Sequence, residues 1–229
     1  MDASADAAAG DGAFLDGLTE AERAALEREG VPRRFARGTA LFHERQPSDK
    51  VVILRDGRVK LTCVTEEGRE ILLAVRGPGD LLGELSAIDG EPRSATAQAL
   101  EAVDALVISR EAFTGFLESN PRVAVVIMQM LARRLRDADR KRVEFAAQDS
   151  VGRVAARLVE LVERFGEDAG DGAVRITLPL SQDELAGWVG ASREAVSKAL
   201  QALRGLGWIE THRRGVTVLD VDALRRRGS

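Results

Sequence analysis

Short apolar runs separated by turn residues dominate the chain between residues 35 and 110. The runs are rich in β-branched side chains and cover residues 40–42, 51–54, 59–65, 71–75, 95–99 and 105–108. Glycine, proline and aspartate separate them, most densely at Gly77-Pro78-Gly79-Asp80. Short strands at regular spacing, with turn signals between them, are typical of an antiparallel barrel or sandwich. The pattern therefore predicts a β-rich domain, preceded by a short helix that opens with a capping box at Thr19 and runs to about Glu29.

A longer period replaces this pattern after a short helix expected at residues 111–117. Beyond Pro121 and up to about Gln148 the chain contains neither glycine nor proline. Spacings of four and three alternate along one line of residues, namely Ala124, Met128, Leu131, Leu135, Ala138, Arg142 and Phe145. Such an a/d seam is typical of two helices packed together, so we expect residues 121–148 to pair with a second copy of the chain. The alternative is an ordinary amphipathic core helix, and Arg142 weakens the far end of the seam.

Helix-start and helix-stop signals follow closely in the last third of the chain. Asp149 is placed to cap a helix over residues 150–165; we expect a polar loop at 167–172 and a strand at 176–180. Ser181-Gln182-Asp183-Glu184 forms a second capping box, Gly190 ends that helix, and Ser192 is placed to cap another. Two short helices joined by a tight glycine-containing turn predict a helix-turn-helix.

The second helix of this pair divides into an apolar face and a polar face. The apolar residues are Val196, Ala199, Leu200 and Leu203, and the polar ones are Arg193, Glu194, Ser197, Lys198 and Gln201. Arginine and lysine suit guanine O6 and N7, and glutamate accepts from cytosine N4, so this face fits a DNA major groove. Contacts with DNA phosphates position the protein on the duplex without specifying a base sequence. We expect such contacts from Ser181, Gln182, Ser192, Ser197, Gln201 and Arg213. Arg213-Arg214-Gly215 lies between two β-rich runs, as a basic wing does; the alternative is a solvated helix face in a small helical subdomain.

The stretch from Gly83 to Ala95 carries the clearest candidate for small-molecule binding. Gly83 lets the backbone approach a ligand closely. Glu84 supplies a carboxylate that accepts from ribose hydroxyls, since a carboxylate aimed at a phosphate would repel it. Arg93 supplies a planar guanidinium and Ser94 a hydroxyl for a phosphate. Together these residues predict a sugar-phosphate pocket.

Composition limits the alternatives. The chain has 229 residues, 45% apolar and 31% charged, which is enough for two domains of ordinary globular composition. No apolar run approaches the ~20 residues of a membrane span, and the Ala/Gly-rich start is interpreted as disordered rather than as a signal peptide, so we expect a cytoplasmic protein. The net charge of −4 argues against nucleic-acid binding, but residues 191–229 hold eight Arg or Lys against four Asp or Glu.

A β-rich pocket domain, a long helix and a winged helix-turn-helix follow one another in this order. The sequence resembles the family of the cyclic-AMP receptor and the fumarate–nitrate regulator (Crp–Fnr), bacterial transcription factors, over about residues 18–224. Two motifs carry the resemblance: Gly83-Glu84-Leu85 followed by Arg93-Ser94-Ala95, and the eight residues from Val189 to Val196. It implies an α+β fold with an N-terminal cyclic-nucleotide-binding β-roll (jelly-roll-like). The implied domains are a disordered 1–17, the β-roll at 18–120, a dimerisation helix at 121–148 and a winged helix-turn-helix at 149–229.

The resemblance also implies a role for individual residues. Gly83, Leu85 and Ala95 would complete the cassette in which Glu84 holds the ribose 2′-hydroxyl and Arg93 and Ser94 hold the cyclic phosphate. Arg134 matches a long-helix arginine near the nucleotide and Glu84. Gly152 matches a glycine that opens the DNA-binding domain, just past the hinge near Asp149. Arg193, Glu194 and Lys198 match the base-reading positions. Lys198 stands where the best-known member has arginine, so we expect a related half-site with looser discrimination.

Base recognition departs from the family pattern at two positions of the long helix. Where the cyclic-AMP receptor uses a Thr-Ser pair to meet the adenine amino group, this chain has Ala138 and Asp139. Ala138 has no hydrogen-bonding group, and ionised Asp139 only accepts, from adenine's amino group or from the paired N–H donors of guanine. The alternative for Asp139 is a solvent-facing carboxylate paired with Lys141 or Arg142.

We therefore expect a homodimeric regulator that binds a palindromic operator in double-stranded DNA under control of a cyclic nucleotide, with cyclic AMP ahead of cyclic GMP, and that meets RNA polymerase. One alternative keeps the DNA binding but alters the pocket to another ligand or to none. A remote alternative is a nucleotide-handling enzyme, for which the sequence offers no metal-ligand cluster, nucleophile–histidine pair or Walker-type loop, and no catalytic residue.

Metal and haem cofactors are not expected. The single Cys63 excludes an internal disulfide and an iron–sulfur cluster held by several cysteines. We interpret Cys63 as a core thiol, with redox sensing as a lesser alternative. His43 and His212 are isolated, and a surface or strand-edge position for His43 is favoured over a haem ligand.

Overall fold

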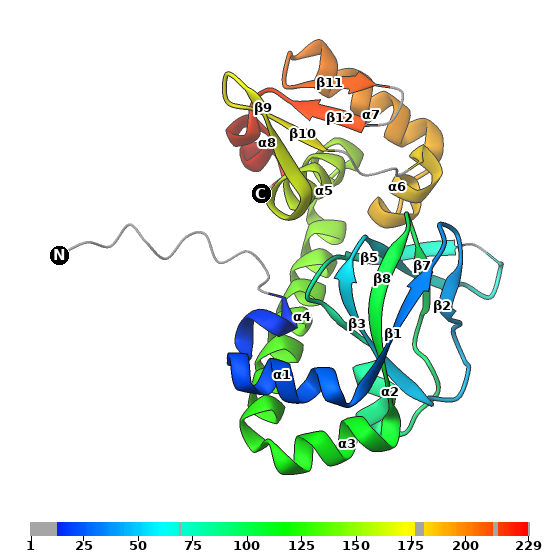
Figure 1. The fold of residues 1–229 in the computed structure, drawn as a ribbon. Helices are drawn as coiled ribbons and strands as arrows, with labels where there is room; N and C mark the ends of the chain where they lie inside the picture. Colours follow the sequence, from blue (N-terminus) through cyan, green and yellow to red (C-terminus); the bar gives the residue numbers. More distant parts are fainter. Residues whose placement is uncertain (1–12, 69, 177–180, 213–214, 229) are drawn as a thin grey trace. The chain divides into compact units, whose positions relative to one another are not determined.

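The fold is known from a computed structural model that describes residues 13–68, 70–176, 181–212 and 215–228 (Figure 1). Its contacts divide the chain into two compact units, of which one ends at Leu135 and the other begins at Arg136. Disorder was expected for residues 1–17, and this was wrong for Phe14–Gly17, which form a short 3-10 helix in which Phe14 is 1% exposed. Residues 1–12 and the basic-wing pair Arg213-Arg214 lie outside the described residues. The predicted domain boundaries remain predictions.

The first unit contains two antiparallel sheets of short strands. One has the order β1 (Gly30–Phe35), β8 (Val103–Ser109), β3 (Lys50–Asp56), β6 (Leu81–Leu82). The other has the order β2 (Ala40–Phe42), β7 (Thr96–Ala99), β4 (Val59–Val64), β5 (Glu70–Arg76). The predicted β-rich domain is confirmed. The sequence did not predict β1, an edge strand that pairs only with β8 and contains a proline and two arginines, because an exposed edge carries no apolar alternation.

Three helices cover the sheet that contains β3 and β8 (Figure 1). They are α1 (Glu20–Arg28), α3 (Arg110–Ser119) and the first part of α4 (Pro121–Ala147). Their apolar side chains, among them Leu26, Phe113 and Ile127, form one buried cluster with Val51 and Ile108 of the strands. The capping box at the start of α1 is confirmed: Thr19 N–H donates to the Glu22 carboxylate at 2.8 Å, and the Thr19 hydroxyl accepts from Glu22 N–H.

Helix α4 carries two apolar faces. Val123, Val126, Ile127 and Met130 are buried in the core of the first unit. On the predicted seam, Leu131 is partly buried, while Met128 is 59% and Leu135 62% exposed. The helix therefore serves as a core helix on one face and keeps apolar side chains at the surface on the other.

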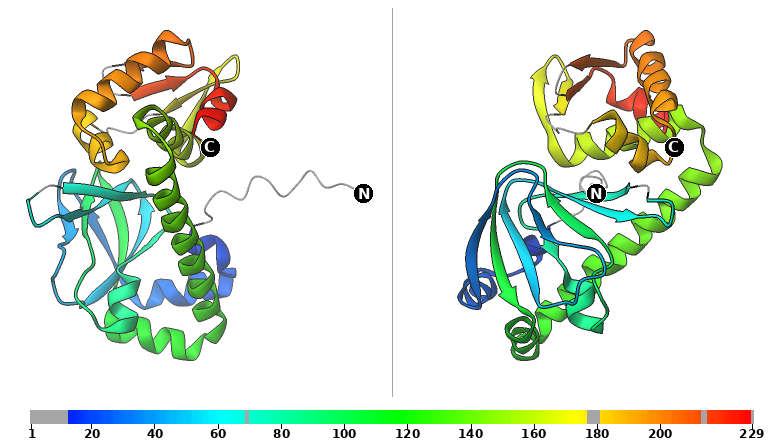
Figure 2. Two further views of the ribbon diagram at one scale, coloured as in Figure 1. Left: turned by 180° about the vertical axis from the view of Figure 1, so that it is seen from behind. Right: turned by 90° about the vertical axis from the view of Figure 1, so that its right-hand side faces the viewer.

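The second unit contains α5 (Ser150–Phe165), β9 (Gly166–Gly170), β10 (Ala173–Ile176), α6 (Gln182–Val189), α7 (Arg193–Gly205), β11 (Ile209–His212), β12 (Gly215–Val218) and α8 (Val221–Arg227). Its sheet has the order β11-β12-β10-β9, and α5 packs against both α7 and α8 (Figure 2). The predicted caps are confirmed, since Asp149, Ser181 and Ser192 each accept a hydrogen bond from the first turn of the helix that follows.

One expectation for this unit was wrong. Residues 167–172, expected as a loop, form the strand β9 and a tight turn, because Glu167 and Asp168 pair with β10. Positive φ angles at Gly170, Asp171 and Gly172 confine the turn to those residues. Of the strand expected at 176–180, Ile176 belongs to β10, and residues 177–180 lie outside the described part of the chain. Helix α8 was not predicted.

Candidate nucleotide-binding and DNA-reading sites

Gly83 has a left-handed backbone conformation and lies directly against the Arg93 side chain. It caps the short helix α2 (Glu84–Asp89) with φ of 79°, in the left-handed region that favours glycine. A Cβ atom at this position would stand 2.3 Å from Nη1 of Arg93. The stretch from Gly83 to Ala95 thus begins with a helical turn, and the glycine at its start makes room for the guanidinium.

The Arg93 side chain is buried and carries an unused donor. Arg93 is 2% exposed, and its guanidinium carbon lies 4.4 Å from the centroid of the Phe42 ring. Its terminal nitrogens donate to the carbonyl oxygens of Gly83, at 3.0 Å, and of Lys50, and Nη2 lies 3.5 Å from Oδ1 of Asp49. Burial lowers the pKa of Arg93, while Asp49 and Glu84 act to raise it. Nε is buried without a hydrogen-bond partner among the described residues. This N–H donor is therefore available to an anion.

Glu84 and Arg134 form a buried ion pair. Nη1 of Arg134 donates to Oε1 of Glu84 at 2.7 Å, and Nη2 donates to the carbonyl of Leu81 at 3.1 Å. Oδ1 of Asp80 lies 3.6 Å from the same Nη2. The side chains of Glu84 and Arg134 are 5% and 15% exposed. The structure thus brings these two predicted residues together and adds Asp80, which the sequence showed only as part of a turn.

The rest of the cassette lies as a short segment beside residues 45–46. Backbone hydrogen bonds of 2.8 Å join Arg93 N–H to Gln46 and Arg45 N–H to the Arg93 carbonyl. Ser94 is exposed, Ala95 is buried, and Leu85 is 44% exposed. The Ser94 side chain is therefore at the surface directly after the buried Arg93 in the chain, and Leu85 of α2 is a partly exposed apolar residue.

Ala138 and Asp139 are exposed residues of α4 within the second unit. Asp139 lies 3.5 Å from Nη1 of Arg142, and their side chains are 60% and 83% exposed. This is the Arg142 pairing that the sequence offered as the alternative to base recognition.

Helix α7 presents the two faces that its sequence predicts. Val196, Ala199 and Leu203 are buried, with exposures of 0 to 1%. The opposite face carries Arg193, Glu194, Lys198 and Gln201, all exposed, and Ser197, partly buried. A polar helix face over an apolar one is the arrangement that a helix needs to enter a major groove while anchored to its domain.

Charge on this face is arranged around Glu194. Hydrogen bonds from its own backbone N–H and from the Ser192 hydroxyl, with Arg193 and Lys198 nearby, hold the pKa of Glu194 below its usual value, so it remains an acceptor. Arg193 lies 3.7 Å from Asp183 of α6. Among the expected phosphate contacts, the Ser181 and Ser192 hydroxyls serve as helix caps, Gln182 is exposed, and Arg213 lies outside the described residues.

Cys63 and His212 were the lesser candidates for a functional role. Cys63 is half-buried, and burial together with Glu44 raises the pKa of its thiol, which keeps it protonated. Nε2 of His212 lies 3.0 Å from the Thr217 hydroxyl. Within the described residues, no three His, Cys, Asp or Glu side chains gather as a metal site. No helix in the same part of the chain is long and apolar enough to cross a membrane.

A β-domain with a buried arginine and a helix-turn-helix with a polar reading face define a DNA-binding regulator with a nucleotide-binding domain. Comparison with known proteins supports both halves. Residues 32–120 match the cyclic nucleotide-binding domain and residues 152–227 the Crp-like helix-turn-helix domain. The chain belongs to the Crp–Fnr family of transcription regulators, as its sequence predicted, and is not an enzyme.

Relatives match over most of the chain. A CRP-like cAMP-activated global transcriptional regulator of Mycobacterium tuberculosis is 37% identical over 93% of this chain and 95% of its own length. The cyclic AMP receptor protein of Thermus thermophilus is 33% identical over 75% of this chain and 76% of its own. The structure of the c-di-GMP-responsive regulator CLP of Xanthomonas campestris has a TM-score of 0.77, at 23% identity, over 87% of this chain and 99% of that one, which supports the fold.

Proposed function

We propose that this protein is a homodimeric, sequence-specific DNA-binding regulator whose β-domain binds a cyclic nucleotide, cyclic AMP in the first place. The observation that carries the proposal is Arg93, a buried guanidinium with an unused Nε, facing a glycine that leaves it room. A phosphate would supply the missing acceptor through charge-assisted hydrogen bonds. Two relatives named for cyclic AMP support the choice of nucleotide.

The pocket is tested by calorimetry with cyclic AMP and cyclic GMP on the full chain. Arg93→Met should abolish measurable heat because it removes the phosphate donors. Arg34→Met, which deletes an arginine that is 75% exposed on β1, is the matched control and should bind like the wild type. No heat from the wild type with either nucleotide would reject the cyclic-nucleotide part of the proposal.

The homodimer is proposed to form through the exposed face of α4. Met128 and Leu135 lie seven residues apart on one seam at 59% and 62% exposure. Sedimentation equilibrium should show a dimer for the wild type and a monomer for Met128→Glu combined with Leu135→Glu. Val31→Glu, at a residue 63% exposed on β1, serves as the control. A double variant that remains dimeric would remove this interface from the proposal.

DNA reading is assigned to Arg193, Glu194 and Lys198, with Ser181, Gln182, Ser192, Ser197, Gln201 and Arg213 on phosphates. A two-fold dimer places its reading helices about one DNA turn apart, ~34 Å, so the operator is a palindrome. Binding of a palindromic duplex selected from a random library, measured with and without cyclic AMP, tests gating by the nucleotide. Equal affinity in both conditions would reject gating while leaving DNA binding intact. We further propose a cytoplasmic location and contact with RNA polymerase.

An effector other than cyclic AMP is the second candidate, because of Ala138 and Asp139. Asp139 already pairs with Arg142 and Ala138 has no polar group, which favours a base other than adenine or a different effector. The relative named as c-di-GMP-responsive shows the same fold with another nucleotide in its name. Calorimetry with cyclic GMP and cyclic di-GMP beside cyclic AMP discriminates between these candidates.

A further inference from the structure

Two residues, Gln148 and Asp149, form the link between α4 and α5. Helix α4 ends at Ala147, and α5 begins at Ser150. Residues inside each helix are committed to its backbone hydrogen bonds, so the direction in which α5 leaves α4 depends on the φ and ψ angles of the link. The contacts that hold the link therefore fix the direction of α5.

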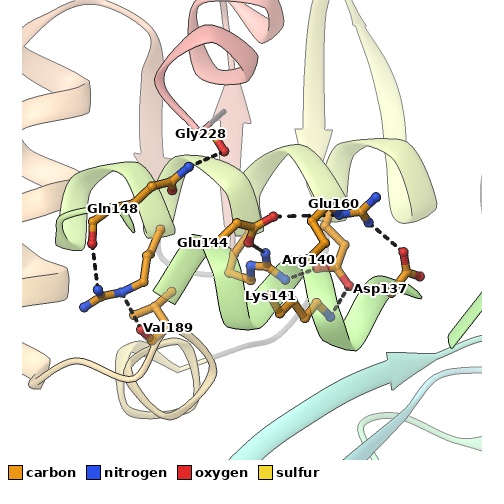
Figure 3. Close-up of polar contacts among 10 residues, drawn as sticks. Asp137, Arg140, Lys141, Glu144, Gln148, Glu160, Val189 and Gly228 are labelled. Atoms are coloured by element: carbon orange, nitrogen blue, oxygen red, sulfur yellow. Dashed lines mark hydrogen bonds and ion pairs between the residues drawn. The ribbon is translucent and has the colours of Figure 1, made fainter. Parts of the chain in front are cut away.

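Arg227 and Gly228, the C-terminal segment, contact both residues of the link. Nε2 of Gln148 donates to the carbonyl oxygen of Gly228 at 2.7 Å (Figure 3). Nη2 of Arg227 donates to the Asp149 carboxylate, with both oxygens at 2.6 Å. Asp149 also accepts from Gly152 N–H at 2.8 Å. These partners, Gly152 foremost and then Arg227, lower the pKa of Asp149, so the carboxylate that Arg227 contacts stays ionised.

Two glycines allow the C-terminal segment to come this close to α5. A Cβ at Gly152 would lie 2.8 Å from Nη1 of Arg227 and 3.2 Å from its carbonyl oxygen. A Cβ at Gly228 would lie 2.8 Å from the backbone nitrogen of Ala156 in α5. Because these distances are shorter than ordinary van der Waals contact, a side chain at either position would displace the segment. The close fit gives a local structural reason for Gly152, which the family resemblance singled out.

Helix α8 is itself anchored to α5. Ala223 and Leu224 are buried, at 3% and 0% exposure, and Asp220 caps the helix by accepting from Ala223 N–H at 2.8 Å. Arg225 lies 3.2 Å from Glu163 of α5. Since α8 packs against α5, the C-terminal segment has a fixed position from which to hold the link.

Arg153 of α5 ties the link to the helix-turn-helix. Its guanidinium donates to the carbonyl oxygen of Gln148 and to that of Val189, the last residue of α6, both at 2.8 Å (Figure 3). Its guanidinium carbon lies 4.9 Å from the centroid of the Phe145 ring. Phe145, which the sequence placed on the dimer seam, packs on the turn of the helix-turn-helix, since a Cβ at Gly190 would lie 2.5 Å from the ring. The position of the link therefore bears directly on the helix pair that carries the reading face.

We propose that Arg227 is a positioning residue for DNA reading: with Gly228 it fixes the link, and the link sets the spacing and orientation of the two α7 helices in the dimer. The inference rests on the proposed homodimer and its palindromic operator. Arg227 is 34% and Asp149 62% exposed, and a pair at such exposure contributes little to stability. Losing the pair should therefore alter the geometry of reading while the domain stays folded.

Binding to a palindromic duplex and to a single half-site, both with cyclic AMP present, separates positioning from folding. Arg227→Met removes the guanidinium and retains an apolar stem. A dimer engages its second half-site at an effective concentration set by the stiffness of what joins its two heads, so affinity for the palindrome should fall about tenfold or more. Affinity for the half-site should change less than about twofold, because no DNA contact is removed.

Three results would overturn the proposal. A half-site affinity that falls as far as the palindrome affinity would show a damaged reading domain, and unchanged affinity for both duplexes would show that the link does not need Arg227. A wild type with equal affinity for the two duplexes would reject the palindromic operator itself, and the positioning role with it.

Changing the distance between the half-sites gives a readout that a loss of stability does not move. One base pair inserted between them displaces one reading position relative to the other, so the wild type should lose affinity. A loosened link should tolerate the insertion better, and the ratio of the two affinities should be about threefold smaller for Arg227→Met. The matched control is Arg226→Met, which removes the same charge from an exposed neighbour and should behave like the wild type. A ratio equal to that of the wild type would contradict the positioning role.

A double-mutant cycle tests the contact itself. Asp149→Asn keeps an acceptor for Gly152 N–H and removes the charge that Arg227 contacts. Alone it should lower palindrome affinity in the same sense as Arg227→Met, and the combined variant should lose less than about twofold more, because both substitutions remove one pair. Fully additive losses would mean that Arg227 acts without Asp149 and would overturn the assignment.

Discussion

Gly83 and Arg93 lie so close together that a side chain at position 83 would collide with the Arg93 guanidinium. A Cβ at position 83 would stand 2.3 Å from Nη1 of Arg93, and φ at Gly83 is +79°. The guanidinium lies against the glycine and donates to its carbonyl oxygen at 3.0 Å. Arg93 is 2% exposed, so it has little freedom to move aside. The glycine therefore sets where the Arg93 donors, which we propose bind the phosphate, point.

Gly83→Ala should weaken cyclic AMP binding about tenfold or more, because Arg93 must shift and the left-handed backbone costs ~1–2 kcal/mol for a residue with a side chain. Gly38→Ala is the matched control, since φ at Gly38 is +81° and nothing lies within 4 Å of its added Cβ. Calorimetry should show near-normal affinity for the control and a clear loss for Gly83→Ala. Equal affinities in the two variants would mean that the close contact has no part in binding.

Short sequence motifs predicted the helix caps better than they predicted contacts between residues far apart in the chain. The caps at Thr19, Asp149, Ser181 and Ser192 were predictable because each depends on residues within one helical turn. The Glu84–Arg134 pair was found only through the family resemblance, since the two residues are fifty positions apart. Strands β1 and β9 were missed because their side chains are mostly exposed and their pairing, not their composition, makes them strands.

Lys198→Arg should sharpen base discrimination by the reading helix. Lys198 is exposed on α7 and presents a point charge, whereas arginine offers a planar fork that bonds guanine O6 and N7 together. We expect the penalty for replacing the contacted guanine to rise by ~1–3 kcal/mol. Competition binding between the selected duplex and single-base variants measures this. A uniform gain in affinity across all duplexes would indicate that position 198 contacts phosphate instead.

Replacing Ala138 by Thr and Asp139 by Ser should improve the response to cyclic AMP, because two hydroxyls able to meet the adenine amino group replace a methyl and a paired carboxylate. The loss of the exposed Asp139–Arg142 pair should cost ~0.2–1 kcal/mol of stability at most. Calorimetry and DNA binding in the presence of cyclic AMP report the gain. An unchanged response would count against a role for these two positions in base recognition.

Glu22 gives the first unit a defined dependence on acid. Its carboxylate bonds Nε of Arg122 at 2.8 Å and the Thr19 backbone, and these partners, Arg122 foremost, lower the pKa of Glu22 to about 2 from 4.5. A depressed carboxyl pKa stabilises the fold above the unfolded value of 4.5, and this stabilisation is lost as the pH falls toward 2. Glu22→Gln should therefore lower the urea midpoint of the first unit at neutral pH, and its difference from the wild type should shrink as the pH is lowered from 4.5. Glu20→Gln, an exposed residue of the same helical turn, should show no such convergence, and a constant Glu22→Gln difference across the titration would contradict the assignment.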